Sequence, residues 1–407
     1  MNSATALQRL DHVLNELSEA LDVPPSRYRD AKDRYDAVGA WLDAEDSSIR
    51  PFRPSIYPQG SFALGTAVKP LGEDDYDVDA VCLLEAPPDG VTQQDLKRCV
   101  GDRLKHPGSR YKGMIEPPGG GRRCWTIRYA DASRFHLDVL PAIPDDYDAI
   151  LRYGVPVELA RDAIRLTDRR TWLDPRAEWP RSNPKGYASW FKGRMSMRLN
   201  EAKLALLKSR VVRADVEEIE DFEVRTPLQR LVQLLKRHRD VRYGGDDDKP
   251  VSIIITTLAA KAYDNEATLA EAMTAVVPRL RYGIEQQNGD YVVLNPVDPR
   301  ENFADKWKEK PRKAQVFFEW LEVVEREHAQ LLTEAGLAKA DEYLLGGYGY
   351  RLGSTGPKTA SETASALGTV GRAAAVAGPA VLAPRKSARA ERPRIDFPSK
   401  PSKPWTP

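Results

Sequence analysis

The segment Tyr76–Leu84, "YDVDAVCLL", restricts the fold more than any other part of the chain. Successive side chains of a β-strand point to opposite faces, so a strand here places Asp77 and Asp79 on one face and its apolar residues on the other. Such a strand can cover a core with one face while its other face carries two carboxylates. We therefore expect a sheet with one buried face and one acidic face.

The segment Phe135–Pro144, "FHLDVLPAIP", has the same alternation and places Asp138 on one face together with His136. If the two strands are neighbours, three carboxylates lie close together. Two unit charges about 4 Å apart repel by on the order of 4 kcal/mol at an effective dielectric constant near 20. Magnesium offsets such repulsion, since it binds carboxylate and phosphate oxygens, and aspartates at i and i+2 can bridge two ions. If Asp77 and Asp79 are considered alone, the alternative to a metal site is that both side chains are solvated at the mouth of a hairpin.

The short stretch before the paired aspartates, "PQGSFALGTAV", contains Gly60 and Ser61, preceded by Gln59. Glycine lets a backbone approach a phosphate closely, and a serine hydroxyl with backbone N–H groups can hold triphosphate oxygens. We expect strand, turn and strand to bring Gly60 and Ser61 beside Asp77. The intervening acidic residues 73–75 are interpreted as an exposed turn.

Hydrophobic periodicity indicates an α+β protein with a mixed sheet and a separate helical part. Segments with short apolar runs, typical of strands, are "SFALGTAV", "DVDAVCLL", "RCWTIRY" and "FHLDVLPAI", with a helix predicted at Thr92–Leu104. Helical spacing is found near the N-terminus, through Leu7–Leu17 and Tyr35–Leu42, and again beyond Pro184.

Three parts of the chain follow from these patterns. Residues 1–183 are predicted to form the N-terminal helices and the core with the sheet, and residues 184–350 a helical lobe. Residues 351–407 are rich in Pro, Ala and Ser with an excess of basic residues, so we expect a flexible basic tail.

The overall charge of the chain is close to neutral. The chain has 61 Lys and Arg against 60 Asp and Glu, so nothing in its charge suggests nucleic acid as the main partner. Its cysteines, Cys82, Cys99 and Cys124, lack metal-binding spacing and fit unpaired thiols in a reducing compartment. We expect a cytoplasmic protein without a signal peptide or a membrane-spanning segment.

Together, "QGSFALGTAVKP", "YDVDAVCLL" and "FHLDVLPAIP" resemble the DNA polymerase beta-type nucleotidyltransferases, and more closely the cGAS/DncV-like nucleotidyltransferases (CD-NTases) of bacterial CBASS anti-phage systems. "NPKGYASWF" from Asn183 and "NPVDPRENFADKW" from Asn295 resemble segments of that family's helical lobe. The resemblance covers about residues 1–345 and implies a two-lobed polymerase beta-type fold.

The resemblance also implies roles for particular residues. Asp77, Asp79 and Asp138 would bind two Mg²⁺ ions, for which Mn²⁺ can substitute, and Asp138 would help to deprotonate an attacking ribose hydroxyl. The residues that would contact the donor nucleotide and its phosphates are Gln59, Gly60, Ser61, Lys236 and Ser252. Because Arg237, His238 and Arg239 adjoin Lys236, a solvated basic helix face is the alternative there.

The activity expected from the resemblance is condensation of nucleoside triphosphates, ATP among them, into a cyclic or linear oligonucleotide second messenger with release of pyrophosphate. Two alternatives stay open: a template-independent nucleotidyltransferase that modifies RNA or a protein, and a nucleotide-binding scaffold without turnover. A regulatory protein could bind through the tail. In some CBASS operons the C-terminus of the enzyme, typically a small residue, is joined to a target, and Pro407 departs from that pattern.

Overall fold

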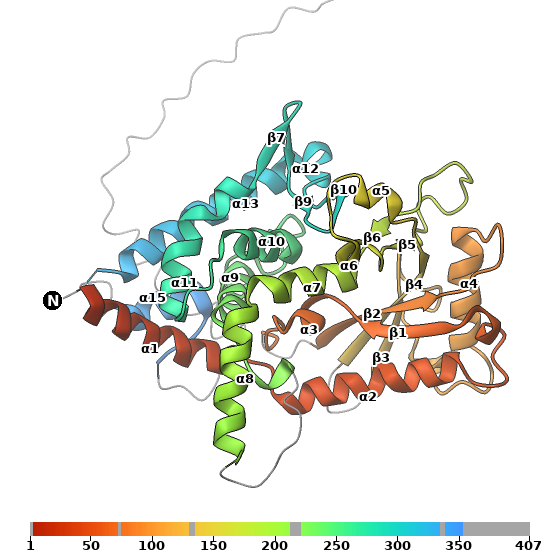
Figure 1. Ribbon diagram of the computed structural model, residues 1–407, viewed down its shortest axis with the longest axis horizontal. Helices are drawn as coiled ribbons and strands as arrows, with labels where there is room; N and C mark the ends of the chain where they lie inside the picture. The colour runs from red at the N-terminus through yellow and green to blue at the C-terminus, as the bar shows by residue number, and fades with distance from the viewer. Residues whose placement is uncertain (1–2, 72–74, 130–134, 212–220, 334–337, 353–407) are drawn as a thin grey trace, which may run out of the picture.

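A six-stranded mixed sheet forms one side of the molecule (Figure 1). The computed structural model describes residues 3–71, 75–129, 135–211, 221–333 and 338–352. The strands run in the order β1-β2-β4-β5-β6 with β3 paired to β4; β2 and β4 are parallel and the other pairs antiparallel. Their bounds are Pro54–Pro58 (β1), Tyr76–Leu84 (β2), Trp125–Tyr129 (β3), Phe135–Pro144 (β4), Ile164–Leu166 (β5) and Arg181–Ser182 (β6).

One face of the sheet is covered by α2 (Pro25–Leu42) and α4 (Gln93–Leu104). Val78, Ala80 and Cys82 are buried in this core, as the alternation in β2 predicts. The helix predicted at 92–104 is α4, and its start is fixed because Thr92 forms a capping box with Asp95.

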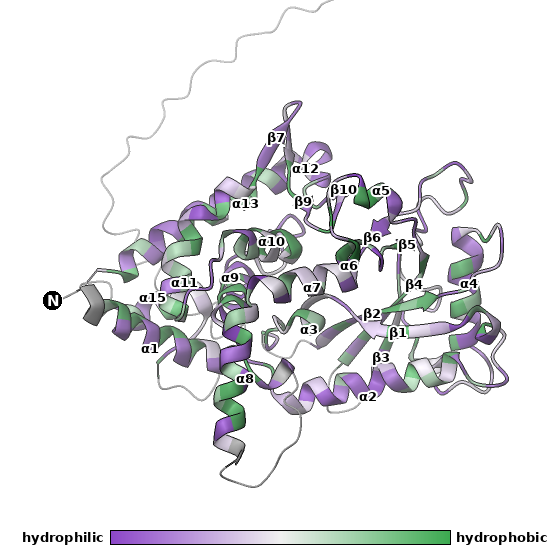
Figure 2. Cartoon of the chain, viewed as in Figure 1, coloured by the Kyte–Doolittle hydropathy of each residue, from purple (hydrophilic) through white to green (hydrophobic). Residues whose placement is uncertain are grey.

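The second half of the molecule is helical and packs around its own large core. Figure 2 shows α10 largely in green, and its residues from Ile254 to Ala260 are all buried. The helices of this lobe are α7 (Pro184–Arg194), α8 (Ser196–Val211), α9 (Pro227–Tyr243), α10 (Ser252–Ala262), α11 (Leu269–Val276), α12 (Lys306–Glu309), α13 (Pro311–Leu331) and α15 (Ala340–Tyr348).

Shorter elements connect these helices and strands. Two small antiparallel pairs lie in the helical half: β7 (Glu285–Gln287) with β8 (Asp290–Val292), and β9 (Leu294–Asn295) with β10 (Asp298–Asn302). The remaining short helices are α5 (Asp148–Leu151), α6 (Val157–Ala160), η1 (Arg50–Phe52), η2 (Lys112–Met114), η3 (Asp221–Glu223) and η4 (Val277–Gly283).

The N-terminal helix α1 (Ser3–Leu21) packs on the helical lobe. Leu10, Leu14 and Leu17 are fully buried in the same core as α9 and α11. This packing differs from the predicted grouping of residues 1–183, although the boundaries at 183 and 350 stay predictions. The predicted basic tail lies outside the described residues, apart from its first two.

One predicted strand is wrong. Residues Gly60–Leu64 form the short helix α3, because Gly60 has a φ of 61° and Gly65, with a φ of 65°, ends the turn. Both conformations are left-handed, which glycine adopts without steric cost. Strands β1, β5 and β6 were not expected, since they are short and flanked by prolines or arginines.

The predicted unpaired cysteines are confirmed: Cys82, Cys99 and Cys124 are all free thiols. None of the described helices combines the length and the apolar content that crossing a bilayer requires.

Candidate active site

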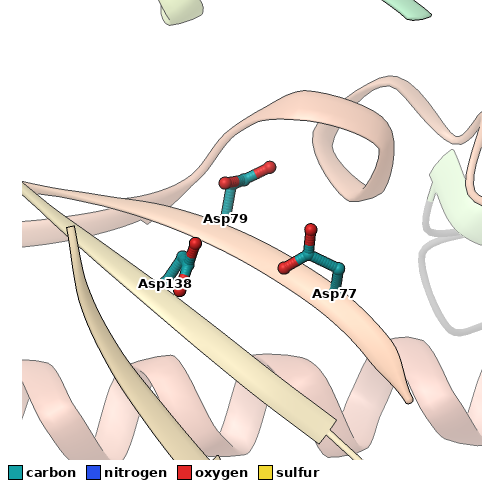
Figure 3. A group of neighbouring side chains, drawn as sticks. All are labelled: Asp77, Asp79 and Asp138. Carbon is teal, nitrogen blue, oxygen red and sulfur yellow. The ribbon is translucent and has the colours of Figure 1, made fainter. Parts of the chain in front are cut away.

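The acidic face of the sheet brings three carboxylates together (Figure 3). Asp77 and Asp79 project from β2, and Asp138 projects from the parallel strand β4, where it is the direct neighbour of Asp79 in register. Ligand oxygens of the three side chains all lie within 4.8 Å of one another. The juxtaposition expected from the alternation of both segments is therefore present.

Burial and mutual repulsion make it energetically unfavourable for all three carboxylates of this cluster to be charged. Burial, with the charges of Asp77 and Asp138, raises the pKa of Asp79 to about 7, and Lys236 opposes this shift. Burial and the charge of Asp138 also raise the pKa of Asp77. A divalent cation would relieve both effects, so the donor set fits a hard metal that prefers oxygen ligands.

The Gln59–Gly60 segment passes directly over Asp79. The backbone N–H of Gln59 donates to the carbonyl of Asp79 at 2.8 Å, which fixes the start of α3 against β2. A Cβ atom on Gly60 would lie 3.0 Å from Oδ2 of Asp79. Glycine is needed here for two reasons: the positive φ and the close approach to a carboxylate.

A cavity of about 680 Å³ opens between this segment and the helical lobe. Its wall includes the predicted residues Gly60, Ser61, Asp77, Asp79, Lys236 and Ser252. Of the predicted residues, Gln59 and Asp138 are not part of this wall. The volume is in the range of sites for cofactor-sized ligands.

The interpretation of residues 73–75 as an exposed turn is wrong for Asp75. It lines the cavity and lies 2.7 Å from Nε2 of His136, with 23% of its side chain exposed, so it is not a solvated turn residue. Residues 73 and 74 of the same turn lie outside the described residues.

Lys236 of α9 lines the cavity, whereas the residues next to it in the sequence make structural contacts. Nζ of Lys236 donates to the carbonyl of Thr66 at 2.9 Å, and two further N–H donors remain on the ammonium group. Burial and the neighbouring Arg239 lower the pKa of Lys236 to about 8. Lys236 is therefore buried and directed at the cavity, unlike the residues of a solvated basic face.

The neighbours of Lys236 have other partners. Arg237 donates to the carbonyl of Lys69. His238 accepts from Nε1 of Trp320 at 3.0 Å through Nδ1; because the indole is only a donor, Nε2 carries the proton toward Glu327.

Arg239 orients the predicted residue Ser252. Its Nη1 donates to Oγ of Ser252 at 2.8 Å and to the carbonyl of Pro250 at 2.9 Å. Sequence reasoning missed Lys69 and Lys249, which add positive charge to the cavity wall. Neither lysine stands in a pattern that distinguishes it from an ordinary surface residue.

The sequence reasoning also missed Thr126 of β3 and Cys124, which directly precedes that strand, and both contact Asp138. Oγ1 of Thr126 donates to Oδ1 of Asp138 at 2.5 Å, and Sγ of Cys124 donates to Oδ2 at 3.2 Å. The sequence does contain one signal: Cys124 and Thr126 alternate with Trp125 and Ile127, which places Cys124 and Thr126 on the same face of a strand. The pairing of β3 with β4 turns this face toward Asp138.

The fold, a mixed sheet with acidic strand residues beside a helical lobe, is that of a polymerase beta-type nucleotidyltransferase. Residues 54–141 match the model of the family described as "Cyclic GMP-AMP synthase DncV-like, nucleotidyltransferase domain". A c-di-GMP synthase of Roseivirga ehrenbergii is 29% identical over 350 residues, which are 85% of this chain and 86% of the relative. The cyclic dinucleotide synthase CdnG of Bradyrhizobium diazoefficiens is 27% identical over 361 residues, 84% of this chain and 81% of the relative.

Solved structures agree at the level of the fold. The structure of CdnG from Bradyrhizobium diazoefficiens in complex with GTP superposes with a TM-score of 0.62 at 22% identity, covering 88% of this chain and 99% of CdnG. The CdnC:HORMA-deltaN complex of Escherichia coli MS115-1 has a TM-score of 0.55 at 14% identity, covering 85% of this chain and 98% of the matched chain. Residues 54–141 therefore carry a DncV-like nucleotidyltransferase domain, and the chain is similar over most of its length to cyclic dinucleotide synthases.

Proposed function

We propose that this protein condenses nucleoside triphosphates into a cyclic or linear oligonucleotide second messenger of anti-phage defence. The observation that carries the proposal is the cluster of Asp77, Asp79 and Asp138 beside a cavity with a cationic wall. Guanine nucleotides join ATP as candidate substrates, since one relative is a c-di-GMP synthase and CdnG was solved with GTP.

The three carboxylates are proposed to hold two Mg²⁺ ions, or Mn²⁺ in their place. Their oxygens lie within 4.8 Å of one another, and the raised pKa values of Asp77 and Asp79 fit a site that gains from a bound cation. When bound, such ions lower the pKa of an attacking hydroxyl and stabilise a leaving pyrophosphate. Asp138 is placed beside Asp79 in register, where it can accept the proton of a ribose hydroxyl.

The donor nucleotide is proposed to lie in the cavity with its triphosphate between α3 and α9. Ser61 offers a hydroxyl group, and Gly60 lets the phosphates approach the backbone. On the opposite wall, Lys236 and Ser252 reach the β- and γ-phosphates, with the lysine as a point charge and Arg239 holding the serine. Gln59, whose backbone N–H donates to the carbonyl of Asp79, is proposed to contribute through its side-chain amide at the rim.

In the reaction, a ribose hydroxyl oxygen of one nucleotide attacks the α-phosphorus of the other. The new P–O bond forms as the bond to pyrophosphate breaks, and the hydroxyl proton passes to Asp138 or to water. A second round within the linear dinucleotide closes the ring and releases a second pyrophosphate. The overall step is a group transfer without oxidation or reduction.

The direct test is incubation of the purified full chain with labelled ATP, GTP, CTP and UTP, singly and in pairs, with Mg²⁺ or Mn²⁺, followed by mass spectrometry of the products. We expect a cyclic or linear oligonucleotide that the Asp77→Asn/Asp79→Asn variant does not form. Asp33→Asn, which changes an exposed aspartate on α2, is the matched control and should retain activity.

Product formation is also measured with protein recovered from phage-infected cells, because members of the family can require an infection signal. A chain that binds labelled GTP or ATP but forms no product under any of these conditions would be a nucleotide-binding scaffold instead. Transfer of label to RNA or to protein would identify the other alternative. A regulatory protein that binds this chain would be recovered with it from the infected cells.

A further inference from the structure

The carboxylate of Asp138 differs from the other two in how it is held. Both of its oxygens accept hydrogen bonds: Oδ1 from Thr126 of β3 at 2.5 Å, and Oδ2 from Cys124, which directly precedes β3, at 3.2 Å. No such donor to the carboxylate oxygens of Asp77 or Asp79 is found among the described residues. One member of the cluster is therefore fixed in orientation, while two can adjust.

The position of these donors follows from strand pairing. Thr126 is the antiparallel partner of Asp138 in register, and Cys124 lies two residues earlier on the same face. Strand β3 is itself anchored to α4, because Nζ of the buried Lys97 donates to the carbonyl of Cys124 at 3.0 Å and Nε1 of Trp125 donates to the carbonyl of Lys97 at 2.9 Å. The two donors thus stand on a strand that is tied to the core.

Trp125 makes this anchor rigid. Its side chain is 4% exposed and packs so closely on Gly101 of α4 that a Cβ atom there would lie 2.0 Å from the indole ring. Packing at this density leaves β3 little freedom to shift relative to α4. The hydroxyl of Thr126 is consequently held at a fixed place beside Asp138.

We propose that Thr126 and Cys124 are positioning residues that fix the plane of the Asp138 carboxylate for metal binding and for the attacking hydroxyl. The inference rests on the proposed role of Asp138. A carboxylate offers about four lone-pair directions, so two hydrogen bonds leave one direction free on each oxygen. Because both donors are neutral, they do not compete with a cation for the site.

Thr126 is the stronger of the two donors, because a thiol is a weak donor and its contact is longer. Partners that orient metal ligands in this way change metal affinity or activity by about 10- to 100-fold when removed. We therefore expect Thr126→Val, which keeps the shape of the side chain but removes its hydroxyl, to weaken metal binding by about that factor. Cys124→Ala should have a smaller effect.

The test measures Mn²⁺ binding by electron paramagnetic resonance in the presence of a non-hydrolysable GTP analogue, together with the Mg²⁺ dependence of turnover and the melting temperature. Thr126→Ser and Cys124→Ser retain a donor and should bind Mn²⁺ like the wild type. Thr171→Val, outside the cluster on an exposed turn, is the matched control. Asp138→Asn defines the loss of affinity when the ligand itself is removed.

Weakened Mn²⁺ binding in Thr126→Val, restored in Thr126→Ser at an unchanged melting temperature, would support the proposal. Wild-type affinity in Thr126→Val would overturn it, and so would an equal loss in the valine and serine variants, because the hydroxyl donor would then not be the cause. If Asp138→Asn also bound Mn²⁺ like the wild type, the proposed function would fail instead. The two failures are therefore distinguishable.

Discussion

At the scale of single residues, the carboxylates that are proposed to bind metal also destabilise the folded chain when no cation is present. Without a cation, Asp79 is surrounded by Asp77 and Asp138 in a setting where burial raises its pKa to about 7. The variant Asp79→Asn keeps the shape of the side chain and removes one charge from this cluster. In EDTA we expect its free energy of unfolding to rise by about 1 kcal/mol, a shift of about 2 °C in the melting temperature.

With Mn²⁺ and a non-hydrolysable GTP analogue, the order should reverse, because ligands that bind the folded state raise its stability only where the site is intact. Differential scanning calorimetry measures both conditions, and Asp33→Asn serves as the control. A variant less stable than the wild type in EDTA would contradict the repulsion argument.

Gly60 is a second residue whose identity follows from geometry. In Gly60→Ala the new methyl group meets Oδ2 of Asp79 at 3.0 Å, and the positive φ adds strain of roughly 1–2 kcal/mol. Gly90→Ala is a matched control, because Gly90 has a φ of 71° and nothing within 4 Å of the added atom. We expect both variants to lose similar stability, but only Gly60→Ala to lose nucleotide binding, by 10-fold or more in isothermal titration calorimetry.

The buried His328 makes stability depend on pH. Burial lowers its pKa to about 4, below its usual value of 6.5, so the unfolded chain binds a proton that the folded chain does not hold between these values. Stability attributable to His328 is therefore constant above pH 6.5 and falls by about 3 kcal/mol as the pH drops toward 4.

In His328→Gln this component of the pH dependence should disappear, whereas His12→Gln, at an exposed position on α1, should behave like the wild type. Urea unfolding at pH 4.5 to 7.5 measures the difference. Parallel curves for wild type and His328→Gln would show that the histidine is not responsible.

At the scale of elements, strong periodicity predicted most of the helices and both acidic strands. The alternation in β2 and β4 was sufficient to find Asp138, which lies 59 residues after Asp79. Helix α3 was mistaken for a strand because a five-residue apolar run has no period of its own and two glycine φ values decide its path. The role of β3 was missed because the alternation of Cys124 and Thr126 with apolar residues indicates a shared face, but not the register that places Thr126 opposite Asp138.

Helix α1 provides a prediction at this scale. Its apolar residues read as an ordinary amphipathic pattern, and only the structure shows that they complete the core of the helical lobe. Leu14→Ala removes a fully buried side chain and should reduce the free energy of unfolding by 2–5 kcal/mol. Leu204→Ala, at a position on α8 that is 56% exposed, should change it by less than about 0.5 kcal/mol. An equally small effect at Leu14 would mean that α1 is not part of this core.

At the scale of the whole molecule, the candidate site is assembled from distant parts of the chain. Helix α9 is joined to the end of α3 and the residues after it by three side chains. Gln229, Gln233 and Lys236 donate to the carbonyls of Leu64, Ala67 and Thr66, respectively. Their spacing is that of one helix face, yet their acceptors are backbone atoms without a sequence signature. For this reason the resemblance to a family, and not periodicity, singled out Lys236 and Ser252.

Helix α15 and the two residues that follow it, the last part of the chain that the structure describes before residue 351, contact both α9 and α1. Tyr348 packs edge-on against His238 of α9 with ring centroids 5.5 Å apart, and the hydroxyl of Tyr350 donates to Glu16 of α1 at 3.0 Å. Figure 1 shows α15 beside α9. Within the described residues from 338 to 352, the buried side chains are those of Ala340, Leu344, Leu345, Tyr348 and Tyr350.

Two truncated proteins therefore distinguish the contribution of the described residues to stability and nucleotide binding from that of the predicted tail. A protein ending at residue 352 should melt within about 2 °C of the full chain and bind a GTP analogue with the same affinity, because it keeps all of these buried residues. A protein ending at residue 339 exposes the face of α9 that α15 covers and should lose roughly 5 kcal/mol or more of stability. Calorimetry and nucleotide titration of both proteins measure these effects. A substantial loss of stability or affinity in the longer truncation would show that residues 353–407 contribute to the folded protein, and phage protection by the same variant would then report whether the tail also acts on a partner.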